Sequence, residues 1–183
     1  MMILVIGGAA SGKSEFAEKI LAKLPGPHYY VATMHKTDDR ETKERIQRHV
    51  NLRKKHDFIT VEQETDVGEV PLSGGGSAMV ECISNLLANE MFLTKRNDAA
   101  EYIVRQLGKL EEKGIHLVVV SNEVASDGGI YDDFTQKYIA FLQQINAMLA
   151  KRAEYVVELV YGIPVFLKGS REELRKEDFL ENI

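Results

Sequence analysis

A glycine-rich segment between an apolar run and an amphipathic segment constrains the fold of this chain more than any other feature. Met2–Ile6 is continuously apolar and rich in β-branched residues, which predicts a strand buried on both faces. Ser14–Leu24 carries apolar residues at spacings of three and four, which predicts a helix. The segment between them fits G-x-x-x-x-G-K-[ST] and has the flanking strand and helix that a phosphate-binding loop requires. Its residues are Gly7, Gly8, Ala9, Ala10, Ser11, Gly12, Lys13 and Ser14.

The small residues of this loop suit it to hold phosphate. They let the chain curl so that successive backbone N–H groups point inward. The helix that follows adds a partial positive charge at the same spot. Lys13 would bridge the terminal phosphates, and Ser14 would offer its hydroxyl to Mg²⁺. The loop therefore predicts binding of a nucleoside triphosphate with Mg²⁺ and leaves the phosphate acceptor open.

Strands and helices alternate along the rest of the chain. We expect further strands at 29–32, 58–62, 78–82, 115–120, 155–160 and 164–167, and further helices at 38–55, 83–92, 98–113, 131–151 and 171–183. This alternation predicts an α/β protein with a P-loop NTPase-type three-layer fold and a mostly parallel central sheet. We expect one domain over residues 1–183, with 66–76 as a surface loop. In such folds ligands bind beyond the carboxyl ends of the strands.

Composition and charge exclude several classes of protein. Cys82 is the only cysteine, so no intrachain disulfide can form, and we expect a reducing, cytoplasmic location. The formal net charge of −5 argues against general nucleic-acid binding. The longest apolar runs are far shorter than the ~20 residues of a membrane-spanning helix, so no span is expected. The apolar N-terminus lacks a basic region and is interpreted as a strand, not as a signal peptide.

Two carboxylates follow expected strands and are candidates for the Mg²⁺ site. Glu81 ends the strand at 78–82, and Glu123 follows the strand at 115–120. We take Glu81 as the metal-binding carboxylate that works with Ser14. Glu123 is an alternative, or it activates an acceptor hydroxyl or holds the second substrate. Either residue can also be a solvated loop carboxylate.

A histidine lies between two arginines on the charged helix expected at 38–55. Arg45, His49 and Arg53 are four residues apart and share one helix face. The arginines disfavour the cationic imidazole and can bind phosphate oxygens in forked geometry. This suits attack by a neutral His49 on an α-phosphate, which would give a phosphoramidate. By spacing alone, however, a solvated helix face is the preferred interpretation.

Motifs along nearly the whole chain support a more specific hypothesis. They are MMILVIGGAASGKS at Met1–Ser14, Tyr30–Thr33, Arg45-Ile46-x-x-His49 with Arg53, Phe58-x-Thr60-Val61-Glu62, Glu81–Ile83 with Asn89, Ser121–Val124, and Tyr161-Gly162-Ile163-Pro164-x-x-x-Lys168. With these motifs the sequence resembles the bifunctional adenosylcobinamide kinase/adenosylcobinamide-phosphate guanylyltransferase family of cobalamin biosynthesis. The glycine-rich loop occurs in many families, whereas the R-I-x-x-H, N-E-V and G-I-P motifs together are specific.

The resemblance implies two reactions and a set of site residues. ATP or GTP would phosphorylate adenosylcobinamide, and GMP from GTP would then pass through a guanylyl-histidine to the phosphorylated corrinoid. The resemblance makes His49 the guanylylated residue and gives Gly7–Ser14 the nucleotide phosphates. It places further residues around the GTP, namely Thr33, Met34, Val50, Asn51, Leu52, Arg53, Glu62 and Glu81. It also implies a homo-oligomer.

Several positions depart from the family pattern. Val50 follows the histidine where arginine is common, and Arg53 precedes lysine where the family often has proline. The N-E-V motif continues as Ala125–Gly129, which differs from the family's common G-x-G-I-V-P. None of these changes removes a proposed reacting group. Two alternatives stay open: a P-loop kinase of another small alcohol, with His49 structural, and a GTP-binding module without catalysis.

Overall fold

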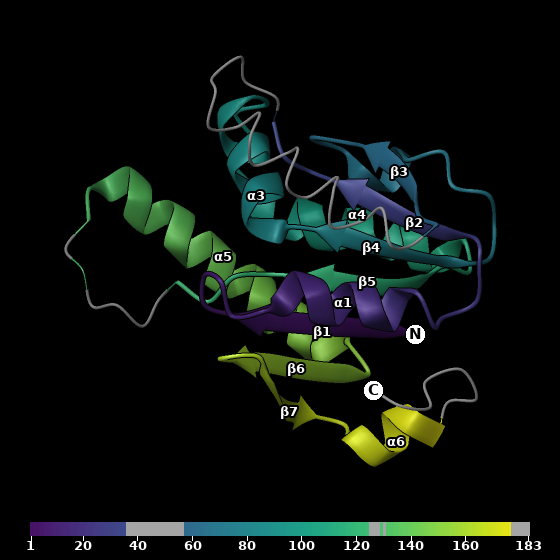
Figure 1. The fold of residues 1–183 in the computed structure, drawn as a ribbon. Coiled ribbons are helices and arrows are strands. Elements are labelled where there is room, and N and C mark those ends of the chain that lie inside the picture. Colours follow the sequence, from purple (N-terminus) through teal and green to yellow (C-terminus); the bar gives the residue numbers. More distant parts are fainter. Residues whose placement is uncertain (36–56, 125–128, 130, 177–183) are drawn as a thin grey trace.

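The computed structural model describes residues 1–35, 57–124, 129 and 131–176, and in these residues seven strands form one sheet (Figure 1). The strand order is β3-β2-β4-β5-β1-β6-β7. The strands are β1 (Met2–Gly7), β2 (His28–Ala32), β3 (Ile59–Glu62), β4 (Ser77–Glu81), β5 (His116–Val120), β6 (Tyr155–Val160) and β7 (Ile163–Lys168). Every neighbouring pair is parallel except β6 and β7, which form an antiparallel hairpin. The predicted α/β fold with a mostly parallel central sheet is confirmed.

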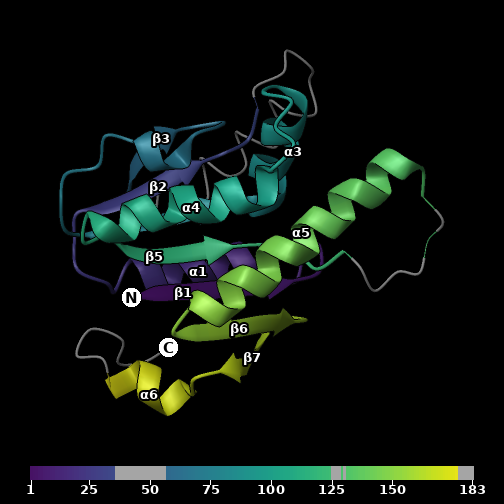
Figure 2. The same ribbon diagram turned by 180° about the vertical axis from the view of Figure 1, so that it is seen from behind.

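Helices cover both faces of the sheet and complete the three layers. They are α1 (Lys13–Leu21), α3 (Ile83–Phe92), α4 (Ala99–Glu112), α5 (Asp133–Arg152) and α6 (Arg171–Lys176). Helices α3, α4 and α5 pack on one face and contribute to one apolar cluster (Figure 2). Helix α1 packs on the other face. Its apolar side chains and Leu174 of α6 belong to a second apolar cluster there. The helix predicted at 38–55 lies outside the described residues.

Strand β1 shows why a continuous apolar run was the right signal for a buried strand. Met2 and Leu4 belong to the cluster beneath α3, α4 and α5, whereas Ile3 and Val5 belong to the cluster beneath α1. Alternate side chains of a strand point to opposite faces, so both faces of β1 need apolar residues. All four side chains are at most 1% exposed. Their burial holds the end of β1, and therefore the loop that follows it, in a fixed position.

The segment at 66–76, predicted to be a surface loop, differs from that expectation in its first half. It contains a short 3₁₀ helix, η1 (Val67–Glu69), which packs against α4. Val67, Val70 and Leu72 are buried in the cluster on that face. Gly68 donates its N–H to Oε1 of Gln106 at 3.0 Å. The prediction was wrong here because the three apolar side chains follow no regular helix or strand period.

Helix α5 begins at a side-chain cap and extends beyond the sheet. The carboxylate of Asp132 accepts hydrogen bonds from the N–H groups of Phe134 and Thr135, both at 3.0 Å. The buried side chains of α5 begin at Leu142, near the middle of the helix, and the start of the helix projects past the sheet (Figures 1 and 2). Among the described residues, no helix combines the length and the apolar character that crossing a membrane requires.

The strand order brings the ends of several strands together at one edge. Strand β5 lies between β1 and β4, so Val120 pairs with Val5 on one side and with Glu81 on the other. On the other side of β1, Gly7 pairs with Leu159 of β6. Because these strands are parallel, their carboxyl ends meet, as the sequence predicted for the ligand-binding edge.

Candidate functional site

The loop from Gly7 to Ser14 connects β1 to α1 at this edge, and close contacts fix its start. A Cβ atom at Gly7 would lie 2.6 Å from the carbonyl oxygen of Leu159 and 2.8 Å from Oγ of Ser11. Gly7 also has a φ of +150°. Only glycine fits such a position without moving the backbone. At Gly8, by contrast, which is exposed, an added Cβ would meet nothing within 4 Å.

Lys13 lies inside this loop and is 7% exposed. Its Nζ donates a hydrogen bond to the carbonyl oxygen of Gly8 at 2.5 Å. Burial lowers the pKa of the Lys13 ammonium, while the nearby Cys82 and Glu81 act in the opposite direction. A desolvated cation with one backbone partner is suited to bind an anion that enters the loop.

Ser14 and Glu81 meet directly across the edge of the sheet. The Ser14 hydroxyl donates to Oε1 of Glu81, and the Tyr30 hydroxyl donates to Oε2 of the same carboxylate. Burial raises the pKa of Glu81 to about 7; the hydrogen bond from Ser14 and the charge of Lys13 lower it, and the charge of Glu18 raises it. A carboxyl group that titrates near neutral pH at a strand end is typical of a functional site.

The Ser14–Glu81 pair has the chemistry of a Mg²⁺ site. A hydroxyl and a carboxylate supply hard oxygen ligands, and Mg²⁺ at nucleotide sites needs only one or two carboxylates besides phosphate oxygens and water. No cluster of three or more histidine, cysteine, aspartate or glutamate side chains suited to a metal occurs in the described part of the chain. Because two oxygen ligands leave the other positions to phosphate oxygens and water, the pair fits a Mg²⁺ ion that is bound together with a nucleotide.

Thr33 and Met34 follow β2 beside the same edge. The Thr33 side chain is fully buried, and its hydroxyl donates to the carbonyl oxygens of Glu81 and Cys82, both at 2.9 Å. Nδ2 of Asn89 donates to the carbonyl oxygen of Thr33 at 2.8 Å. Thr33 thus joins the ends of β2 and β4, while Met34 is half-buried. That either residue contacts a nucleotide stays a prediction.

Other predicted site residues lie apart from the loop or outside the described residues. Glu62 is exposed at the end of β3, an edge strand separated from β1 by three strands. The structure therefore does not bring Glu62 to the loop. His49 and the stretch Val50–Arg53 lie outside the described residues, as does Arg45.

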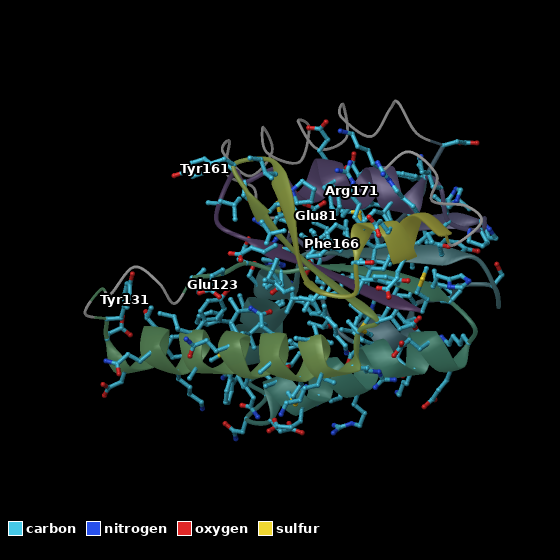
Figure 3. The ribbon with its side chains drawn as sticks, turned by 90° about the horizontal axis from the view of Figure 1, so that it is seen from below. Glu81, Glu123, Tyr131, Tyr161, Phe166 and Arg171 are labelled. Carbon is cyan, nitrogen blue, oxygen red and sulfur yellow. The ribbon has the colours of Figure 1, made fainter. Side chains whose placement is uncertain are left out.

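Glu123 lies next to the loop, because β5 is the neighbour of β1. Its N–H donates to the carbonyl oxygen of Gly7 at 3.0 Å. The preceding Ser121 and Asn122 belong to a polar network: the Ser121 hydroxyl donates to Oδ1 of Asn146 at 2.6 Å, and Nδ2 of Asn122 donates to Oγ of Ser84 at 2.7 Å. Figure 3 shows Glu123 at the same end of the molecule as the turn between β6 and β7.

Sequence reasoning missed two contacts of this site. Tyr30 lies on β2, and only the pairing of β2 with β4 shows that its hydroxyl reaches Glu81. The turn between β6 and β7 contacts the loop as well, because Gly162 donates its N–H to the carbonyl oxygen of Ser11 at 2.9 Å. The G-I-P motif was the available signal for the turn, although its position beside the loop depends on the strand order.

Comparisons with known proteins agree with this geometry. A family model described as cobinamide kinase / cobinamide phosphate guanyltransferase matches residues 3–167. The bifunctional adenosylcobalamin biosynthesis protein CobP of Pseudomonas aeruginosa is 28% identical over 175 residues, which cover 92% of this chain and 98% of that protein. The bifunctional adenosylcobalamin biosynthesis protein CobU of Salmonella typhimurium is 29% identical over 184 residues, which cover 92% of this chain and 100% of that protein.

Among solved structures, a KaiC-like protein from the archaeon Pyrococcus horikoshii has a similar fold. Its TM-score is 0.51 at 14% identity, and the alignment covers 93% of this chain and 79% of that chain. This likeness concerns the fold alone. The match of the family model over most of the chain is the stronger finding: the chain belongs to the cobinamide kinase / cobinamide phosphate guanyltransferase family and is an enzyme of the transferase class.

Proposed function

We propose that this enzyme phosphorylates adenosylcobinamide with a nucleoside triphosphate and then transfers GMP from GTP to the product, giving adenosyl-GDP-cobinamide. The arrangement of Lys13, Ser14 and Glu81 around the glycine-rich loop carries the kinase half of this proposal. The family match over residues 3–167 supports both halves. His49 of the R-I-x-x-H motif supports a covalent intermediate in the transfer of GMP.

In the kinase step, the acceptor hydroxyl of the corrinoid attacks the γ-phosphorus, the bond to the β-phosphate oxygen breaks, and a nucleoside diphosphate leaves. Lys13 neutralises charge on the terminal phosphates, and the loop N–H groups hold them in place. Ser14 and Glu81 would hold Mg²⁺, which supplies charge neutralisation at the β- and γ-phosphates when bound. Glu123, whose N–H contacts Gly7 of the loop, is our candidate to orient the acceptor hydroxyl or take its proton.

In the guanylyl step, an imidazole nitrogen of His49 attacks the α-phosphorus of GTP and pyrophosphate leaves. A phosphorus–nitrogen bond forms, and the imidazole releases its N–H proton. A phosphate oxygen of the phosphorylated corrinoid then attacks the same phosphorus. The phosphorus–nitrogen bond breaks as the imidazole takes up a proton to replace the one it released, a diphosphate forms, and His49 returns to its neutral state. We assign GTP contacts to Thr33, Met34, Val50–Arg53 and Glu62 on the family pattern.

We also propose that the enzyme acts as a homo-oligomer in the cytoplasm. The single cysteine, Cys82, fits a reducing compartment. A homo-oligomer would allow His49 of one subunit to serve a loop of the same or of a neighbouring subunit. Sedimentation of the purified protein with and without GTP measures the assembly directly.

The test of the guanylyl step is covalent labelling with GTP that carries a radioactive α-phosphate. The wild-type protein should keep an acid-labile label through denaturation, and His49→Ala should lose that label while it keeps the kinase activity. His35→Ala is the matched control, because His35 is exposed and paired with Glu64 at 2.6 Å. Label that persists in His49→Ala assigns the nucleophile to another residue.

A P-loop kinase of another small alcohol is the second candidate. The residues that the described site brings together, Lys13, Ser14 and Glu81, are those of the kinase step. It predicts γ-phosphate transfer to an alcohol without any covalent GMP. A comparison of turnover with cobinamide and with other small alcohols separates the two. Tight GTP binding without turnover of any of these acceptors would indicate a binding module without catalysis.

A further inference from the structure

Tyr30 is a buried tyrosine whose hydroxyl reaches the candidate site, although the proposed reactions do not use it. Its side chain is 2% exposed and belongs to the apolar cluster beneath α1. Burying a hydroxyl costs free energy unless it finds a hydrogen-bond partner. A phenylalanine would fill the same space without that cost. The hydroxyl donates to Oε2 of Glu81, so its role is to be sought in that carboxylate.

The register of the sheet explains how Tyr30 reaches Glu81. Strands β2 and β4 are parallel neighbours, and Tyr30 pairs with Met79, two residues before Glu81 (Figure 1). Tyr30 and Met79 both belong to the cluster beneath α1. Because alternate residues of a strand point to the same face, the Glu81 side chain lies on that face too. A long side chain on β2 spans the diagonal to Glu81, while Ser14 approaches it from the start of α1.

The two oxygens of the Glu81 carboxylate accept from two different donors. The Ser14 hydroxyl donates to Oε1, and the Tyr30 hydroxyl donates to Oε2. With one donor alone, the carboxylate could turn about its last bond, because the terminal torsion of a glutamate is broad. A second donor on a ring that the core holds in place fixes the plane of the carboxylate. Oε1 is thereby kept toward Ser14.

A phenol suits this role because it is neutral. A lysine or an arginine in its place would also orient the carboxylate, but its positive charge would oppose the binding of a cation. The Tyr30 hydroxyl leaves the negative charge of an ionised Glu81 in place. Groups that orient a metal ligand in this way contribute to metal affinity without touching the metal.

We propose that Tyr30 is a positioning residue, whose hydroxyl holds the Glu81 carboxylate in the orientation that binds Mg²⁺ together with Ser14. The proposal rests on the proposed Mg²⁺–nucleotide role of Ser14 and Glu81 and deepens it. Tyr30 acts through Oε2 of Glu81 and needs no contact with the nucleotide or the cation.

Calorimetry of nucleotide binding in Mg²⁺ and in EDTA separates the contribution of the cation from that of the loop. ATP and GTP are both titrated, and every protein carries His49→Ala so that transfer of guanylate adds no heat. Tyr30→Phe removes one oxygen atom and keeps the ring, so the core stays filled. Its Kd in Mg²⁺ should rise about tenfold, while its Kd in EDTA should stay at the value of the parent protein.

Tyr29→Phe is the matched control, because it removes the same group from the neighbouring residue of β2. Tyr29 is also buried, but it belongs to the cluster on the opposite face of the sheet. Its hydroxyl forms a hydrogen bond with Oγ of Ser73 at 2.5 Å, away from Glu81. Both Kd values of this variant should equal those of the parent protein.

A double variant tests whether Tyr30 acts through Glu81. Glu81→Gln should itself raise the Kd in Mg²⁺. Addition of Tyr30→Phe to Glu81→Gln should then raise it little further, because the group that the hydroxyl orients has already been replaced. Two full losses that add would show that the hydroxyl acts elsewhere, and would overturn the proposal.

The outcomes separate this inference from the proposed function. If Glu81→Gln raises the Kd in Mg²⁺ and Tyr30→Phe does not, the positioning role alone is overturned. An equal rise in Mg²⁺ and in EDTA for Tyr30→Phe also overturns it, because the hydroxyl would then support the loop and not the cation. If Glu81→Gln leaves the Kd in Mg²⁺ unchanged, the assignment of the cation to Ser14 and Glu81 fails, and the role of Tyr30 fails with it.

Discussion

The hydroxyl of Ser14 donates a hydrogen bond to the carboxylate of Glu81, and this contact joins the start of α1 to the end of β4. Burial raises the pKa of this Glu81 carboxyl to about 7. Part of the Glu81 population therefore carries a proton at neutral pH before any cation binds. A divalent cation at this position would favour the ionised form and expel the proton.

The first prediction is that binding of a Mg²⁺–nucleotide at pH 7 releases a fraction of a proton from Glu81. Calorimetry in two buffers of different ionisation enthalpy measures that release. Titration of the nucleotide's own phosphate adds to it, so the comparison is with Glu81→Gln, which retains the phosphate contribution alone. Equal proton release by the two proteins would contradict the assignment of Glu81 to the cation.

The same pKa shift makes a prediction about folding stability. An unfolded glutamate loses its proton near its ordinary pKa of 4.5, whereas the folded protein holds the proton up to about pH 7. The folded state binds more protons in this interval, so Glu81 lowers the free energy of unfolding as pH rises from 4.5 to 7. The loss is about 3 kcal/mol and persists at higher pH.

Glu81→Gln should therefore be more stable than the wild type at pH 8, while the two proteins differ little at pH 5. Urea unfolding at both pH values measures the difference. Glu69→Gln is the control, since the bond to Lys109 at 2.5 Å lowers the pKa of the exposed Glu69 carboxyl. That control should show no gain at pH 8. A gain of equal size in both variants would reject burial of Glu81 as the cause.

The sequence predicts those parts of the fold that local patterns determine. The apolar run of β1, the glycine-rich loop and the start of α1 lie together in the chain, and their periods are distinct. Strand order is different, because it depends on contacts between distant segments. Nothing in the sequence shows that β5 lies between β1 and β4, although this arrangement places Glu123 beside Gly7.

The same distinction applies to the site. Lys13, Ser14 and Glu81 were predicted from a motif and from a strand end, and the structure brings them together. The contact of Tyr30 with Glu81 needs the pairing of β2 with β4. The contact of Gly162 with Ser11 joins opposite ends of the chain. Side-chain roles that depend on such pairings become visible only in three dimensions.

The third prediction concerns Lys13, the buried cation of the loop. Lys13→Ala should lower kinase turnover at least about a hundredfold, because the charge that faces the developing negative charge of the transferred phosphoryl group is lost. The fold should be little changed, because the lysine's hydrogen bond to the carbonyl oxygen of Gly8 offsets only part of the cost of burying its charge. Lys19→Ala is the control, since Lys19 is 60% exposed and paired with Glu15. Kinase turnover close to the wild-type value in Lys13→Ala would remove the lysine from the reaction.

The last prediction concerns Gly7 and Gly8 at the start of the loop. We expect Gly7 to matter for stability and Gly8 for nucleotide binding. Gly7→Ala should lower the free energy of unfolding by about 3 kcal/mol, because its Cβ would lie 2.6 Å from the carbonyl oxygen of Leu159. Gly8→Ala should change stability by less than about 0.5 kcal/mol, since nothing lies within 4 Å of its Cβ. That open space is where we place the phosphates, so Gly8→Ala should still weaken nucleotide binding. Urea unfolding and nucleotide titration of both variants measure the two effects, and a Gly8→Ala protein with wild-type affinity would move the phosphates elsewhere.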